Sequence, residues 1–210
     1  MVRAFWIRKE RSAPPDSTTR ALPRPFHTVG SGPYRRFVRV VGLLRGVNLG
    51  PNRRLRMADL RAVVESLGCA DVETHLQSGN VLFSPPEGAG RDLGAEISEA
   101  LAAAVDLSAV VQIRSGAEMA AVVAANPYQR ADPTKVVVTF CPTPQQPPDL
   151  DLAAFAPEGL TVIGREVYLD LPYGQARSPL LAALAKSVPD DGQATSRNWR
   201  TVLAIAERTR

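Results

Sequence analysis

The chain has 210 residues, of which 45% are hydrophobic and 22% charged, a composition typical of a soluble globular protein with one domain or two small ones. A chain of this length can bury roughly 70% of its unfolded surface, so it needs no disulfide or metal to remain folded. No apolar run approaches the ~20 residues of a membrane helix, and we expect no membrane partner.

Cysteine and histidine are too few and too dispersed to indicate a metal or redox site. Cys69 and Cys141 are far apart, with no C-x-x-C motif, and the only histidines are His27 and His75. Lone thiols of this kind are typical of a reducing compartment, which predicts a cytoplasmic location. We expect neither a metal nor a cofactor.

Basic residues are concentrated at the start of the chain. Residues 1–36 contain eight basic and two acidic residues, a net charge of +6, whereas the whole chain carries +4. Residues 37–210 therefore carry a net charge of −2. Binding to a phosphate backbone depends on clustered surface cations, so nucleic acid is not an expected partner of the folded core.

The first 36 residues contain five prolines and no sustained hydrophobic period, which predicts a disordered, basic, Pro/Ser-rich extension. Three interpretations are open: an extension upstream of the true start, a basic arm, or a targeting peptide. The segment lacks the apolar core of a secretory signal, and its prolines disfavour the amphipathic helix of a transit peptide. We favour an extension without a function.

From residue 37 onward the hydrophobic pattern alternates between the periods of strands and helices. Apolar runs rich in β-branched residues predict strands, a Ser-Gly pair predicts a hairpin turn, and Gly68 ends a segment with apolar residues at helical spacing. The predicted order is strand, helix, strand, strand, helix and strand, at 37–47, 57–68, 71–77, 80–83, 93–105 and 109–114. This β-α-β-β-α-β order is that of a ferredoxin-like unit.

The second half repeats part of this pattern. A linking helix is followed by a strand, a short helix, a hairpin and two closing helices, at 116–126, 135–140, 150–156, 160–171, 178–187 and 196–208. We therefore predict an α+β protein of two tandem ferredoxin-like (β-α-β-β-α-β) subdomains. The first covers residues 37–114, and the second, modified with C-terminal helices, covers 115–210.

Polar residues from two distant segments are predicted to meet at one end of the first sheet. In this chain order, the loop after the first strand and the hairpin between the second and third strands share that end. The loop contributes Arg45, Asn48, Arg53 and Arg54, and the hairpin contributes Gln77, Ser78, Gly79 and Asn80. Amide side chains can recognise a base edge, a sugar or an acid. The candidates for ligand binding are Arg45, Asn48, Gln77, Ser78 and Asn80.

Several of these residues also have a purely structural interpretation. Gln77 and Asn80 can hydrogen-bond across the turn, because the glycine between them supplies a positive φ. Arg45 can pair with Asp59 or Glu73. Both interpretations are open at this point.

Two predicted helices near the C-terminus begin beside an arginine. The residues concerned are Arg177 and Ser178 at the first helix, and Arg197 and Asn198 at the second, with Thr195 or Ser196 as the second cap. A cation at a helix N-terminus opposes the helix dipole, so capping does not explain the arginines. An anion bound beside the free backbone N–H groups would explain them, and we therefore add these residues to the candidates.

Several motifs, taken in chain order, resemble those of one protein family. They are RGVNLG (45–50), QSGN (77–80), NPY (126–128), LPYGQARSPL (171–180) and ATSRNWRTV (194–202). The sequence over residues 38–208 is similar to the uncharacterised family known as domain of unknown function 1697. The resemblance implies two ferredoxin-like α+β subdomains in tandem and no agreed activity. Pro51 departs from the family pattern, in which a second glycine is common in this loop.

No familiar catalytic motif is present, since the sequence has no G-x-S-x-G, Walker, HExxH or dinucleotide fingerprint. We predict a cytoplasmic binding protein or enzyme for a small phosphorylated or carboxylated ligand, held by the arginine and amide residues named above. The alternative is a non-enzymatic protein- or RNA-binding module. An RNA-binding sheet needs exposed aromatic residues, and the strands offer only Phe37, Phe83, Phe140 and Tyr168.

Overall fold

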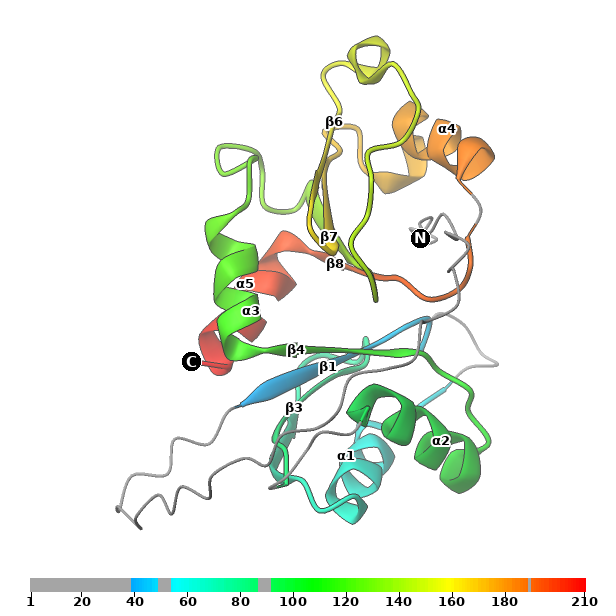
Figure 1. Cartoon of the computed structure of the whole chain (residues 1–210), viewed down its shortest axis with the longest axis vertical. Helices are drawn as coiled ribbons and strands as arrows, with labels where there is room; N and C mark the ends of the chain where they lie inside the picture. Colours follow the sequence, from blue (N-terminus) through cyan, green and yellow to red (C-terminus); the bar gives the residue numbers. More distant parts are fainter. Residues whose placement is uncertain (1–38, 49–53, 87–91, 189) are drawn as a thin grey trace, which may run out of the picture.

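The computed structural model describes residues 39–48, 54–86, 92–188 and 190–210, and these form an α+β structure with two four-stranded antiparallel sheets (Figure 1). Five α-helices accompany the sheets in this described part of the chain. None of the described helices is long and apolar enough to cross a membrane. The extension predicted for residues 1–36 lies outside the described residues.

The first sheet forms from the strands predicted in the first half. It contains β1 (Val40–Leu44), β2 (Ala70–Thr74), β3 (Asn80–Ser84) and β4 (Val111–Ser115), in the order β2-β3-β1-β4. Central strand β1 is antiparallel to both neighbours, and Val41 lies opposite Leu82 on one side and Arg114 on the other. All residues of β1 and β3 are buried, because both faces of the sheet are covered.

Helices α1 (Met57–Ser66) and α2 (Leu93–Val105) cover one face of this sheet (Figure 1). Their apolar stripes pack with alternate strand residues, among them Val40 and Leu44, into one hydrophobic core. Asp92 begins α2 by accepting a hydrogen bond from the backbone N–H of Ala95 at 3.1 Å.

The second sheet repeats the strand order of the first. It contains β5 (Val136–Phe140), β6 (Gly159–Ile163), β7 (Glu166–Asp170) and β8 (Thr195–Asn198), in the order β6-β7-β5-β8. The first crossover of this half contains a 3-10 helix, η1 (Leu152–Phe155), and the second contains η2 (Gln175–Arg177) and α4 (Pro179–Ser187). Helix α4, η1 and one face of the second sheet enclose a second core.

Strand β8 was not predicted. The sequence predicted one helix over 196–208, whereas the structure has β8 followed by α5 (Trp199–Arg208). Strand β8 has the sequence TSRN, which contains no apolar residue and no strand period, and it forms by pairing with β5, where Arg197 lies opposite Val138. The helix prediction was therefore wrong over its first residues, because tertiary pairing outweighed the local pattern.

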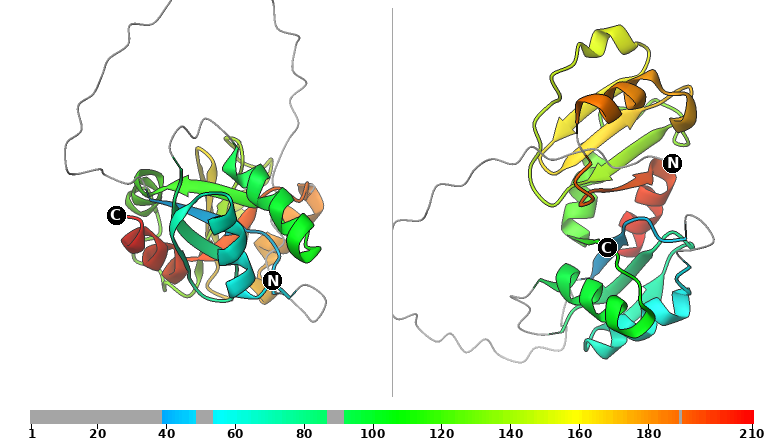
Figure 2. Two further views of the ribbon diagram at one scale, coloured as in Figure 1. Left: turned by 90° about the horizontal axis from the view of Figure 1, so that it is seen from below. Right: turned by 90° about the vertical axis from the view of Figure 1, so that its right-hand side faces the viewer.

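Two helices lie between the sheets. Helix α3 (Gly116–Ala124) links the halves and α5 closes the chain, and both lie in the central layer of the molecule (Figures 1 and 2). They form a core with the inner faces of both sheets, including Val41 and Leu43 from β1 and Phe140 and Tyr168 from the second sheet. The structure is therefore layered, and the two inner sheet faces share one hydrophobic core with these helices.

Candidate functional site

Arg197 of β8 lies at the boundary between the two halves, where it contacts two of the other predicted polar residues, Ser78 and Asn80. Its Nε donates to Oδ1 of Asn80 at 2.5 Å, and its Nη2 donates to the carbonyl oxygens of Leu44 at 2.8 Å and Gly79 at 3.2 Å. Its Nη1 donates to Oγ1 of Thr195 at 2.8 Å and to the neighbouring carbonyl of residue 196 at 2.9 Å. All three guanidinium nitrogens are thus occupied by acceptors of the chain itself.

This guanidinium is buried, and none of the described carboxylates is its counterion. Arg197 is 7% exposed, and it forms no ion pair with any carboxylate in the described part of the chain. Burial lowers the pKa of Arg197 to about 10, since desolvation disfavours the charged form. Arg197 therefore joins the two halves and has no donor left for a ligand.

Asn80 closes the QSGN turn and positions Arg197. Asn80 is fully buried, and its Nδ2 donates to the carbonyl oxygen of His75 at 2.8 Å and to Oγ of Ser78 at 3.0 Å. Gly79 has a φ of +72°, and a Cβ there would lie 2.5 Å from Cγ2 of Val47. The structural interpretation of Asn80 is therefore confirmed, and its Oδ1 serves Arg197.

Arg45 also crosses the boundary between the halves. Its Nη2 pairs with Oδ2 of Asp190 at 2.5 Å, and its Nη1 donates to the carbonyl oxygen of Ala194. The alternative partners suggested by the sequence are instead paired with other arginines, Asp59 with Arg56 and Glu73 with Arg39. Arg45 thus holds the segment that leads into β8.

The amide of Asn48 holds the loop after β1 against the hairpin. Asn48 has a φ of +56°. Its Nδ2 donates to the carbonyl oxygens of Leu55 at 3.0 Å and Gln77 at 2.6 Å, and its Oδ1 accepts from the backbone N–H of Leu55 at 2.8 Å. The predicted convergence of the two segments is therefore observed, and Asn48 makes the direct contact between them.

A hollow of about 460 Å³ opens beside this contact, and we call it the hairpin hollow. It is lined by Asn48, Arg54, Leu55, Arg56 and Gln77. Arg56 is paired through Nε and Nη2 with Asp59, both at 2.7 Å. Arg54 and Gln77 are exposed, and among the described residues nothing bonds to either side chain. These two side chains are the free polar groups of the hairpin hollow.

Arg177 and Ser178 lie in the other half of the molecule, where η2 leads into α4 (Figure 1). Oε2 of buried Glu158 accepts from Oγ of Ser178 and from the backbone N–H of Leu180, both at 2.9 Å. A carboxylate of the chain itself therefore occupies this helix N-terminus, where the sequence suggested a ligand anion. Arg177 is exposed and does not share the hairpin hollow.

Asn198 caps α5, and neither Thr195 nor Ser196 does so. Its Oδ1 accepts from the backbone N–H of Thr201 at 2.9 Å. Thr195 and Ser196 belong to β8, where Oγ1 of Thr195 donates to the carbonyl oxygen of Leu44 at 3.2 Å. The cap prediction was wrong because the chain is still extended at these two residues.

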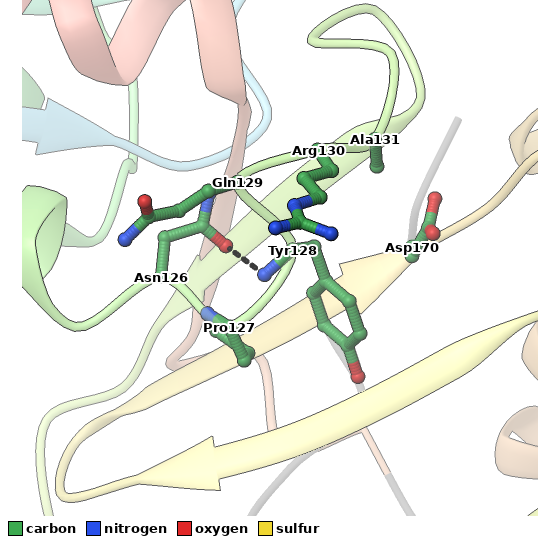
Figure 3. Close-up of a pocket in the computed structure, with 7 residues that line it drawn as sticks. All are labelled: Asn126, Pro127, Tyr128, Gln129, Arg130, Ala131 and Asp170. Carbon is green, nitrogen blue, oxygen red and sulfur yellow. Dashed lines mark hydrogen bonds between the residues drawn. The ribbon is translucent and has the colours of Figure 1, made fainter.

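A second hollow, of about 580 Å³, was not predicted as a site, and we call it the NPY hollow (Figure 3). It is lined by Asn126, Pro127, Tyr128, Gln129, Arg130, Ala131 and Asp170. The NPY motif was visible in the sequence, but the contribution of β7 through Asp170 depends on tertiary structure. No group of three or more His, Cys, Asp or Glu residues that could hold a metal occurs in the described ranges.

The chain is thus an α+β protein with two four-stranded antiparallel sheets, which a buried arginine connects. The family model for a protein of unknown function, DUF1697, matches residues 38–168, and the chain belongs to this family. The resemblance read from the sequence is thus confirmed.

Among solved structures, the fold is similar to that of the conserved bacterial protein SP0830 from Streptococcus pneumoniae. The TM-score is 0.64 with 22% sequence identity, over 82% of this chain and 98% of that one. No curated protein matches the sequence.

Proposed function

We propose that the protein binds a small phosphorylated or carboxylated ligand in the hairpin hollow. One observation carries this proposal: Arg54 and Gln77 line the same hollow, and both side chains are without a partner among the described residues. A guanidinium can hold a phosphate or carboxylate through two parallel hydrogen bonds, and an amide N–H adds a third. The volume of about 460 Å³ suits a small metabolite.

Under this proposal, the other predicted residues support the hollow rather than contact the ligand. Asn48 fixes the loop to the hairpin, and Asn80 with Arg197 fixes the hairpin to the second half. None of the five lining residues is a carboxylate, a thiol, a hydroxyl or an imidazole. The hollow therefore supports binding better than acid–base or nucleophilic catalysis.

A protein- or RNA-binding module is the second candidate, and it has less support. Phe83, Phe140 and Tyr168 are all buried, so none of them offers a stacking surface on a sheet, and Phe37 lies outside the described residues. The net charge of −2 over residues 37–210 also disfavours contact with a phosphate backbone.

We further propose that residues 37–114 and 115–210 are two tandem ferredoxin-like subdomains of a cytoplasmic protein. The matching orders β2-β3-β1-β4 and β6-β7-β5-β8 support this assignment, since each corresponds to the β-α-β-β-α-β chain order. Strand β8 gives the second half the fourth strand that the sequence prediction lacked.

A thermal-shift screen with inorganic phosphate, nucleotides, sugar phosphates and small carboxylic acids tests the proposed binding. A ligand at 100 times its Kd stabilises the native protein by about 2.7 kcal/mol, which such a screen detects. We expect Arg54→Ala and Gln77→Ala each to weaken binding of the best anion by about tenfold or more.

The matched control is Arg200→Ala, which removes an exposed arginine from α5 and should leave the affinity unchanged. Phosphate also stabilises proteins without specific binding, and the Arg54→Ala variant separates the two effects. Equal stabilisation of wild type and both hollow variants by every anion would refute the proposal.

A further inference from the structure

The NPY hollow lies at the end of β7, a strand of the second sheet (Figure 3). The hairpin hollow lies beside the first sheet and shares no lining residue with it. The loop 126–131 supplies most of the lining of the NPY hollow and Asp170 supplies the rest. Its volume of about 580 Å³ exceeds that of the hairpin hollow. The hollow is thus large enough for a small organic molecule.

The frame of this hollow is rigid. Oδ1 of Asn126 accepts from the backbone N–H of Tyr128 at 2.9 Å, which fixes the turn at its start (Figure 3). The Tyr128 hydroxyl is hydrogen-bonded to Oγ1 of Thr161 at 2.9 Å. The tyrosine ring lies directly over Gly159, where a Cβ would approach its atoms to 2.7–2.9 Å. The ring and hydroxyl of Tyr128 therefore hold the loop against β6, and its backbone N–H fixes the turn.

Two opposite charges in the lining are unpaired. Arg130 and Asp170 both line the hollow, and in the described part of the chain neither has an ion pair or a side-chain hydrogen bond. A guanidinium in contact with Asp170 would lower the pKa of that carboxyl. Its pKa is instead raised, first by burial and then by the nearby Glu158 carboxylate. The two charges therefore do not neutralise each other.

Asn126 belongs to the frame of the hollow. The residue is 3% exposed, and its Oδ1 accepts from the Tyr128 N–H. Its Nδ2 has no acceptor among the described residues, but this nitrogen has almost no accessible surface, so a molecule in the hollow does not reach it. The charged groups of the lining that can meet a ligand are therefore Arg130 and Asp170.

We infer that the NPY hollow binds a free α-amino acid, with its carboxylate held by Arg130 and its ammonium group held by Asp170. A zwitterion satisfies the cation and the anion of the lining together. A simple carboxylic acid would leave Asp170 unpaired beside a second negative charge, and a simple amine would leave Arg130 unpaired. This site is separate from the proposed anion site, and the two can be tested independently.

Isothermal titration with the common L-amino acids is the experiment, followed by two analogues of the amino acid that binds best. One analogue lacks the ammonium group and the other lacks the carboxylate. We expect the amino acid to bind about tenfold or more tightly than either analogue, because each charge-assisted contact contributes at least that factor.

Two variants assign the contacts. Arg130→Gln should weaken binding of the amino acid and leave binding of the amine analogue unchanged. Asp170→Asn should weaken binding of the amino acid and leave binding of the acid analogue unchanged. Both are conservative changes at residues that are not buried, and thermal unfolding checks that each variant is folded. Lys186→Gln, at an exposed lysine of α4 that lines neither hollow, is the matched control and should bind the amino acid as wild type does.

Three results would overturn the inference: no L-amino acid binds, the acid analogue binds as tightly as the amino acid, or both variants keep wild-type affinity. A loss of amino-acid binding in Arg54→Ala alone would move the ligand to the hairpin hollow. Since the anion screen uses Arg54 and Gln77 variants and this one uses Arg130 and Asp170 variants, failure of one proposal is distinguishable from failure of the other.

Discussion

Nε of Arg197 donates to Oδ1 of Asn80 at 2.5 Å, and this bond connects β8 of the second sheet with β3 of the first across 117 positions of sequence. Both residues are buried, and both also bind the backbone of the hairpin. The QSGN motif therefore supplies hydrogen-bond acceptors to an arginine of the same chain. Its role is to fix the two halves relative to each other.

Replacement of this arginine should destabilise the whole molecule. We expect Arg197→Ala to lower the free energy of unfolding by at least about 3 kcal/mol, since each buried acceptor left without a donor costs about 1–3 kcal/mol. Arg197→Lys should recover only part of the loss, because an ammonium group offers three donors in place of five. Urea unfolding measures the change.

The control for this prediction is Arg200→Ala, at an exposed arginine three positions further on. It should change the free energy of unfolding by no more than about 0.5 kcal/mol. Equal effects of the two alanine variants would show that the buried network does not hold the halves together.

Gly79→Ala should destabilise the protein more than Gly164→Ala, a substitution at a glycine with a similar φ. Gly79 and Gly164 have φ values of +72° and +60°, so alanine is strained at both positions by about 1–2 kcal/mol. A Cβ at residue 79 would also lie 2.8 Å from Cβ of Leu44, an atom next to the backbone that cannot move aside, whereas nothing lies within 4 Å at residue 164. Thermal unfolding of both variants should give the larger loss for Gly79→Ala, and equal losses would contradict the steric argument.

Glu118 should make stability depend on pH in the acid range. Burial opposes its ionisation, but hydrogen bonds from the Ser115 N–H at 2.7 Å and hydroxyl at 2.9 Å, together with Arg165 and Arg114, lower its pKa overall. A lowered carboxyl pKa stabilises the native state above the unfolded-state value of about 4.3, and this contribution is lost as the pH falls through the native-state value.

The stability difference between wild type and Glu118→Gln should thus be constant near neutral pH and shrink below about pH 4. Urea midpoints measured at several pH values test this. A difference for Glu118→Gln that is independent of pH would contradict the assignment.

Cys141 should be inert toward alkylating reagents in the native protein. Burial raises the pKa of its thiol to about 12, although the nearby Arg114 acts in the opposite direction. At pH 8, its thiolate fraction is about a thousandfold below that of a free cysteine. In a Cys69→Ala background, iodoacetamide should label Cys141 only after unfolding, and rapid labelling of the folded protein would show that the thiol is accessible.

The sequence by itself determined the secondary structure of the first half and the meeting of the RGVN loop with the QSGN hairpin. Hydrophobic period, turn chemistry and chain order are local properties, and they place Asn48 and Gln77 side by side, as observed. The same reasoning failed at residues 195–198, where an apolar period is absent and only pairing with β5 makes a strand.

Tertiary structure alone decided which polar side chains are free. An arginine has the same sequence signature whether its donors face a ligand or its own chain, and the acceptors of Nε and Nη2 of Arg197 come from residues more than 100 positions away. The structure therefore assigns Arg197 and Arg45 to the boundary between the halves, and leaves Arg54 and Arg130 without partners in the described part of the chain. Hydrogen-bond saturation is a property of three-dimensional neighbours. This is why the binding proposals rest on Arg54, Arg130 and Asp170, which were not among the predicted site residues, and on only one residue that was, Gln77.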